Sequence, residues 1–142
     1  MQHNKVFSAA IALCVIAFFT VGPVHSASAA TQVPVTITAV FDFSTFPNLS
    51  GNFTTTGALT ISGTAFMHVD LNPFNGIRAH CVVTLTASNG TIIIDQQCQF
   101  ASSPPKGRWE IVGGTGAYAN LNGHGPLTMP PNTEAMTGVI YQ

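Results

Sequence analysis

The sequence predicts an all-β fold, an antiparallel β-barrel of about eight strands, on three observations. Apolar and polar residues alternate along several stretches, which is the pattern of strands with one buried face. Clusters of Gly, Pro, Asn and Ser separate these stretches. No stretch after residue 30 shows a helical period. Long antiparallel strands in one small domain favour a closed barrel, which has no exposed edge, and a β-sandwich is the alternative.

Residues 1–30 are predicted to be a signal peptide that precedes a single barrel domain, residues 31–142. A short basic segment leads into the apolar run 7–21, Gly22-Pro23 ends it, and small residues suited to cleavage follow. The run is shorter than the roughly 20 residues that a membrane span needs. We therefore expect a secreted protein, extracellular or periplasmic, with no stable membrane anchor after cleavage.

Few charged side chains remain after residue 30: three are basic and five are acidic, a net charge of −2. They form no basic patch, so nucleic-acid binding has no electrostatic support. Two cysteines, Cys81 and Cys98, are left in the predicted exported chain. An even number of cysteines in an exported domain favours a disulfide.

The first half of the domain is predicted to contain three strands. Residues 33–43 alternate between apolar and polar side chains, with Val40 as the exception. Strands at 52–61 and 65–71 follow, joined by a three-residue turn that places Leu59 opposite Met67. In this register His68 and Asp70 face solvent, which avoids burying them without partners. The residues expected to face inward from the third strand are Ala65, Met67, Val69 and Leu71.

A β-hairpin is predicted over residues 78–100, because Asn89-Gly90 suits a two-residue type I′ turn. With this turn Cys81 lies directly opposite Cys98 at a non-hydrogen-bonded pair, where Cα atoms are about 4.5 Å apart. That separation permits the disulfide between them. The same register gathers apolar residues on one face of the hairpin and threonines on the other.

The C-terminal part is predicted to contain a short strand at 108–112 and a closing strand at 133–142, joined through a glycine-rich corner. Trp109 and Ile111 share one face of the short strand. The corner begins with Gly113, Gly114, Thr115 and Gly116, and continues with Tyr118, Gly123 and Gly125.

This corner resembles the signature of the allene oxide cyclase and dirigent-type β-barrels, in which Gly-Gly-Thr-Gly is followed by an aromatic residue and a further glycine. The upstream stretches GNFTTTGALTISGTAF and TLTASNGTIII resemble small exported bacterial proteins of uncharacterised function. The resemblance implies an eight-stranded barrel with a central cavity. It implies no activity, because no catalytic residue of those families matches a position in this chain.

The first hypothesis is a non-enzymatic exported barrel that binds a small apolar or aromatic ligand. For the apolar residues of the interior, a core filled by side chains is the favoured interpretation, and a ligand cavity is the other. An enzyme of the cyclase or isomerase type is another alternative, and it requires a polar or charged group inside the barrel. A surface or envelope interaction module, which could be oligomeric, is a third. The residues expected to line the interior are Phe41, Phe53, Leu59, Met67, Leu85, Ile94, Phe100 and Trp109.

The sequence assigns no catalytic residue, no metal and no cofactor. Gly114–Ala119 matches the dinucleotide pattern G-x-G-x-x-A, but neither a helix nor a βαβ unit can follow it. Three carboxylates, Asp42, Asp95 and Glu110, are expected to face outward. The spacing of the remaining candidate ligands requires no metal site; they are His68, Asp70, His80 and His124.

Overall fold

The computed structural model describes residues 30–74 and 76–141, so residues 1–29 of the predicted signal peptide lie outside the described residues. The described residues form a closed antiparallel barrel. Each strand pairs with its neighbours in sequence, and β8 pairs with β1. This confirms the predicted fold class. The strands are β1 (Gln32–Asp42), β2 (Asn48–Gly57), β3 (Ser62–Leu71), β4 (Arg78–Ala87), β5 (Gly90–Gln99), β6 (Lys106–Gly114), β7 (Asn122–Thr128) and β8 (Thr133–Tyr141).

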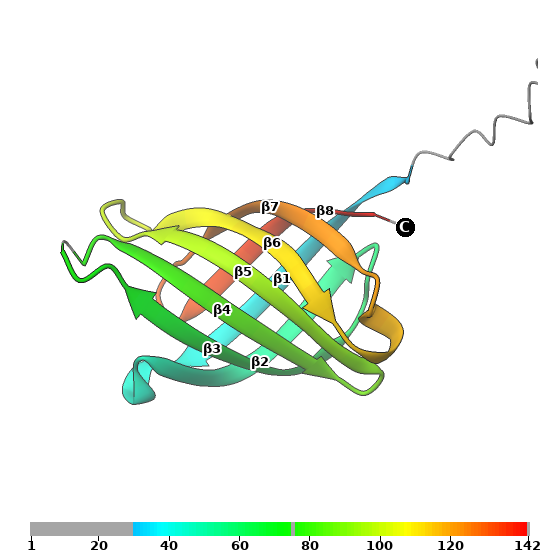
Figure 1. Ribbon diagram of the computed structural model, residues 1–142, viewed down its shortest axis with the longest axis horizontal. Helices are drawn as coiled ribbons and strands as arrows, with labels where there is room; N and C mark the ends of the chain where they lie inside the picture. Colours follow the sequence, from blue (N-terminus) through cyan, green and yellow to red (C-terminus); the bar gives the residue numbers. More distant parts are fainter. Residues whose placement is uncertain (1–29, 75, 142) are drawn as a thin grey trace, which may run out of the picture.

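Two short 3-10 helices lie in the connections between strands: η1 (Phe43–Thr45) follows β1, and η2 (Gly116–Tyr118) follows β6. None of the helical segments in the described part of the chain is long and apolar enough to cross a membrane. The described ends of the chain meet at one end of the barrel, where Gln32 pairs with Tyr141 (Figure 1). The connections after β1, β3, β5 and β7 lie at the opposite end, which we call the mouth.

Buried and exposed side chains alternate along each strand, and the buried ones form the core. On β1, Val35, Ile37, Ala39 and Phe41 are buried, and on β8 Met136 and Ile140 are buried in the same way. Each fully buried Leu or Ile contributes about 1.5–3 kcal/mol relative to an exposed one. The closed sheet thus encloses one apolar interior, which is filled by side chains such as Leu85, Ile92, Ile94 and Leu127 over most of its length.

Trp109 ties three strands together in this interior. Its ring is 2 % exposed, and its indole Nε1 donates to the carbonyl oxygens of Pro126 on β7 and Thr137 on β8, at 3.1 and 3.0 Å. A Cβ on Gly138 would lie 2.8 Å from the indole ring, so the ring packs against the backbone of β8. The same Cβ would lie 2.2 Å from the backbone carbonyl oxygen of His124 on β7, so both the neighbouring strand and Trp109 exclude a side chain at this position.

The predicted register between the second and third strands is wrong. β2 begins at Asn48, and Leu49, which is fully buried, pairs with Met67. The connection after β2 runs from residue 58 to 61, where the backbone of Ile61 donates to Thr55 Oγ1 at 2.9 Å and that hydroxyl donates to the carbonyl of Leu59 at 2.7 Å. Leu59 therefore lies in a loop, partly buried against the core, rather than in the barrel wall.

The predicted register of the Cys81–Cys98 hairpin is also wrong, by two residues. Ala87 pairs with Gly90, so the connection is Ser88-Asn89, and Cys81 pairs with Gln96. A tertiary contact is made by this turn: Ala117 N, in η2, donates to the carbonyl oxygen of Asn89 at 2.9 Å. Because the shift is even, every side chain keeps its predicted face.

The glycine-rich segment that begins at Gly113, predicted to be a corner, forms a turn in only part of its length. Gly113 and Gly114 are the last residues of β6, so the turn predicted at 113–116 begins at Thr115. Gly116 has φ 60°, a conformation that favours glycine. The remaining part of the segment forms β7, a strand that the alternation of the sequence did not reveal.

Candidate functional site

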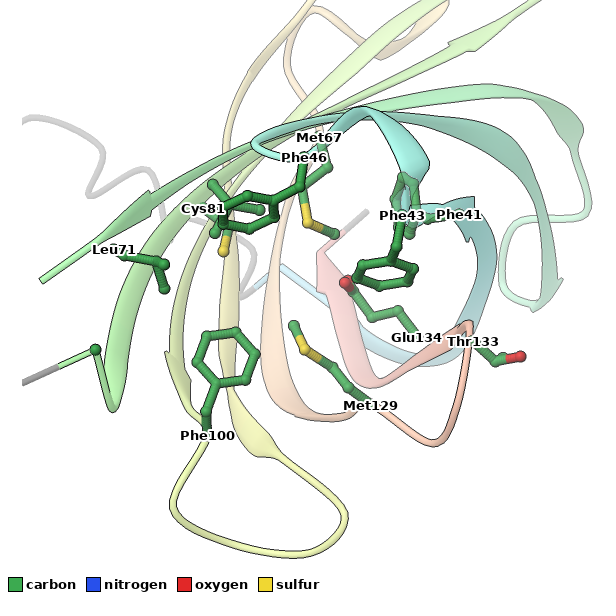
Figure 2. A pocket seen from close by; sticks show the side chains of 12 residues that line it. Phe41, Phe43, Phe46, Met67, Leu71, Cys81, Phe100, Met129, Thr133 and Glu134 are labelled. Atoms are coloured by element: carbon green, nitrogen blue, oxygen red, sulfur yellow. The ribbon is translucent and has the colours of Figure 1, made fainter.

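A cavity of about 280 Å³ opens at the mouth of the barrel (Figure 2). Its walls come from the mouth ends of β1, β3, β4 and β8, from η1 and the loop after it, and from the connections that follow β3, β5 and β7. Aromatic and aliphatic side chains and two methionines form most of the lining. The lining residues are Phe41, Phe43, Phe46, Met67, Val69, Leu71, Gly76, Cys81, Phe100, Met129, Thr133 and Glu134.

Glu134 lies at the inner side of this cavity, and the period of β8 places it there. It is two residues before Met136 on the strand, so both side chains point into the barrel. Glu134 pairs with Ala39 on β1, whose small side chain leaves room for the carboxyl. The Glu134 side chain is 2 % exposed, and Figure 2 shows its carboxyl directed into the space between the aromatic rings.

One oxygen of the Glu134 carboxyl has a partner and the other has none. The side-chain amide of Gln96, fully buried on β5, donates from Nε2 to Glu134 Oε1, and the same nitrogen lies 3.3 Å from Met136 Sδ. Glu134 Oε2 has no hydrogen-bond partner among the described residues. The hydrogen bond from Gln96 thus leaves Oε2 as the buried carboxyl oxygen without a partner in the described part of the chain.

Burial raises the pKa of Glu134 to about 7, although the hydrogen bond from Gln96 acts in the opposite direction. Removal from water disfavours the charged carboxylate more than one neutral donor stabilises it. Near neutral pH the group is therefore divided between a protonated form, which can donate from Oε2, and a carboxylate, which can only accept. No Lys, Arg or His is among the residues that line the cavity.

The two cysteines lie beside this carboxyl, but the predicted direct pairing of Cys81 with Cys98 is wrong. The two-residue shift of the hairpin makes them diagonal neighbours on the inner face, and both are free thiols with their Sγ atoms 3.7 Å apart. The neighbouring Cys81 thiol and burial raise the pKa of Cys98. This thiol is therefore protonated at neutral pH and is a poor nucleophile.

Seven of the eight predicted lining residues divide into two groups, and the eighth, Leu59, lies in the loop after β2. Phe41, Met67 and Phe100 line the cavity. Phe53, Leu85, Ile94 and Trp109 are buried in the filled part of the interior. For this second group a core filled by side chains is the correct interpretation.

Sequence reasoning missed Glu134 and Gln96 as neighbours inside the barrel. The signal for Glu134 was present, because the alternation that turns Met136 inward also turns Glu134 inward. The alternation that turns Ile94 and Cys98 inward also turns Gln96 inward, but nothing in the sequence connects it with Glu134. Their proximity depends on barrel closure, which brings β5 and β8 across from each other.

The polar side chains on the outer surface of the described barrel form no site like that of Glu134. His68 and Asp70 are exposed as predicted, and His68 Nδ1 lies 2.7 Å from Asn48 Oδ1. His80 contacts Asp95 on the outer wall. In the described part of the chain no three His, Cys, Asp or Glu side chains gather closely enough to hold a metal ion.

Comparison with known proteins returns no match. No family model, no curated protein and no solved structure matches this chain. The resemblance to the allene oxide cyclase and dirigent-type barrels stays a prediction, and the site must be interpreted from its own geometry.

Proposed function

We propose that this protein is an exported barrel that binds a small, largely apolar molecule in the mouth cavity. The observation that carries the proposal is the Glu134 carboxyl at the inner side of an otherwise apolar cavity, with one oxygen unpartnered. Binding sites commonly combine apolar walls with a few polar groups that orient the ligand. A volume of about 280 Å³ is just below the usual range for drug-sized ligands, so the ligand is small.

Narrowing the mouth is expected to weaken binding. Leu71 lines the cavity at its edge and is 38 % exposed, so Leu71→Trp places a larger ring at the opening with little effect on the core. We expect the affinity for toluene or indole, measured by NMR titration, to fall at least about tenfold, equivalent to about 1.4 kcal/mol. Val112→Trp, at an exposed position on β6, is the matched control. Equal affinities for the two variants would contradict the proposed location.

Acid–base catalysis on the bound molecule is the second candidate function, favoured by the pKa of about 7 for Glu134. The protonated carboxyl would transfer its Oε2 proton to an epoxide oxygen or alkene carbon, leaving a carbocation stabilised by the surrounding rings. The carboxylate would then remove a proton from a neighbouring carbon. The net reaction is an isomerisation or cyclisation with no atom gained or lost, and it regenerates the acid.

Isomerisation is expected to depend on this carboxyl. In D₂O, small unsaturated epoxides incubated with the wild-type protein would yield an isomer, detected by NMR. Glu134→Gln is expected to lower its rate at least about a hundredfold, the lower range for loss of a general acid, while still binding the epoxide. An equal rate in the variant would exclude this role.

Export and the state of the cysteines form a linked proposal, supported by the leader-like residues 1–30 and by two thiols 3.7 Å apart. In an oxidising compartment, exchange with an oxidised dithiol carrier would join Cys81 and Cys98 and reduce the carrier. Intact mass measurement of the exported protein is expected to show a chain that starts near residue 30 and lacks two hydrogen atoms. Free thiols in that exported chain would contradict the oxidation.

A further inference from the structure

We infer that the mouth cavity is a site for a small organic cation, an alkylated ammonium group held between the Glu134 carboxylate and the phenyl rings of the mouth. This inference rests on the proposed function and deepens it by naming the chemical class of the ligand. It is carried by the charge, the lining and the hydrogen bonding of the cavity together.

The charge of the cavity can only be negative. Glu134 is its one carboxyl, and no basic side chain is among the lining residues. Gln96, the partner of Glu134 on β5, is neutral, so it leaves the carboxylate charge uncompensated. An anionic ligand would therefore be repelled, whereas a cation would supply the missing countercharge.

The other groups near Glu134 do not change this sign. The neighbouring titratable groups are the thiols of Cys81 on β4 and Cys98 on β5. The inward residues of β1, β3 and β6 near this end are apolar, as is that of β7. They are Ala39, Phe41, Met67, Trp109 and Leu127.

The walls of the cavity suit a cation with alkyl substituents. Figure 2 shows the rings of Phe43, Phe46 and Phe100 around the space into which Glu134 points, with the thioethers of two methionines beside them. The face of an aromatic ring attracts a cation, and quaternary ammonium groups are recognised in this way. Thioether sulfur is polarizable and adapts to irregular ligands.

A metal ion would be a poorer occupant. Ca²⁺ and Mg²⁺ take six or more oxygen ligands, and the cavity offers one carboxyl among apolar side chains. An alkylammonium ion needs no such shell, because its methyl groups would pack against the rings while its charge lies near the Glu134 carboxylate.

The test compares choline with 3,3-dimethylbutan-1-ol, which replaces the charged nitrogen by carbon and keeps the shape. We expect choline to bind the wild-type protein at least tenfold more tightly at pH 8, by calorimetry or NMR titration. Glu134→Gln should remove this preference, so that the two probes bind the variant with similar affinities. Glu110→Gln, which removes an exposed carboxylate on β6, is the charge-matched control and should retain the preference.

Other results would contradict the cation inference alone, or the inference together with the proposed ligand binding. If the alcohol binds as tightly as choline, the cation inference fails and the proposed ligand-binding function stands. If neither probe binds at millimolar concentration, both fail. Should Glu134→Gln not fold, the pH dependence of the wild-type protein decides: the preference for choline should disappear at pH 5, where Glu134 is protonated, and its persistence there would refute the inference.

Discussion

Glu134→Gln is expected to be about 3 kcal/mol more stable than the wild-type protein above pH 7 and equally stable near pH 4. The unfolded chain ionises Glu134 with a pKa near 4.5, whereas burial raises the pKa in the folded protein to about 7. Between these values the unfolded state binds fewer protons, so wild-type stability falls as pH rises from about 4.5 to about 7 and then stays low. Each pH unit between them corresponds to about 1.4 kcal/mol.

Urea unfolding from pH 4 to pH 9 measures this effect. The variant keeps an acceptor for the Gln96 amide, so its free energy of unfolding should lack the decline that Glu134 causes in the wild-type protein. Glu110→Gln controls for the change in net charge, since that carboxyl is exposed. Parallel pH profiles for wild-type protein and Glu134→Gln would show that the carboxyl is not buried as described.

Trp109→Ala is expected to lower the free energy of unfolding by about 3–5 kcal/mol, the usual cost of truncating a buried aromatic residue. The ring is 2 % exposed, and its Nε1 donates to two carbonyl oxygens, of Pro126 and Thr137. The substitution leaves a void and two carbonyls without this donor. Because small domains are stable by only about 5–15 kcal/mol, much of the stability would be lost.

Trp109→Phe separates the two contributions. It keeps an apolar ring of smaller size and removes the N–H, so we expect a loss of about 1–3 kcal/mol, mostly from the unpaired carbonyls. Circular dichroism during urea unfolding serves for all variants, since Trp109 is the only tryptophan and its fluorescence disappears with it. A loss under 1 kcal/mol for Trp109→Ala would mean that the ring does not link the three strands.

The faces of the strands could be predicted from the sequence, but their registers could not. Alternation identifies Val35, Ile37 and Phe41 as inward whatever they pair with. A shift of two residues preserves this sorting, so the Cys81–Cys98 hairpin satisfied the same pattern in the wrong register. The observed turn contacts a distant segment, through the hydrogen bond from Ala117 to Asn89, and such a tertiary contact has no local sequence signal.

The site could be predicted only in part, because some of its residues lie in loops and some of its contacts form only when the barrel closes. Phe41 and Met67 follow from alternation within their strands. The mouth also depends on connections that lack a period, which supply Phe46, Phe100 and Met129. Glu134 could have been assigned to the interior from Met136, but its contact with Gln96 appears only when the sheet closes. Closure also decides which part of the interior is filled and which stays open.

The most direct test of the central claim is the pKa of the Glu134 carboxyl in the folded protein. It is measured by following the ¹³C shift of the side-chain carboxyl carbon with pH, with Glu134→Gln identifying the signal. A buried carboxyl with one unpartnered oxygen predicts a midpoint of about 7. A midpoint near the ordinary value of 4.5 would show that the carboxyl is solvated, and would contradict the site on which both proposed functions rest.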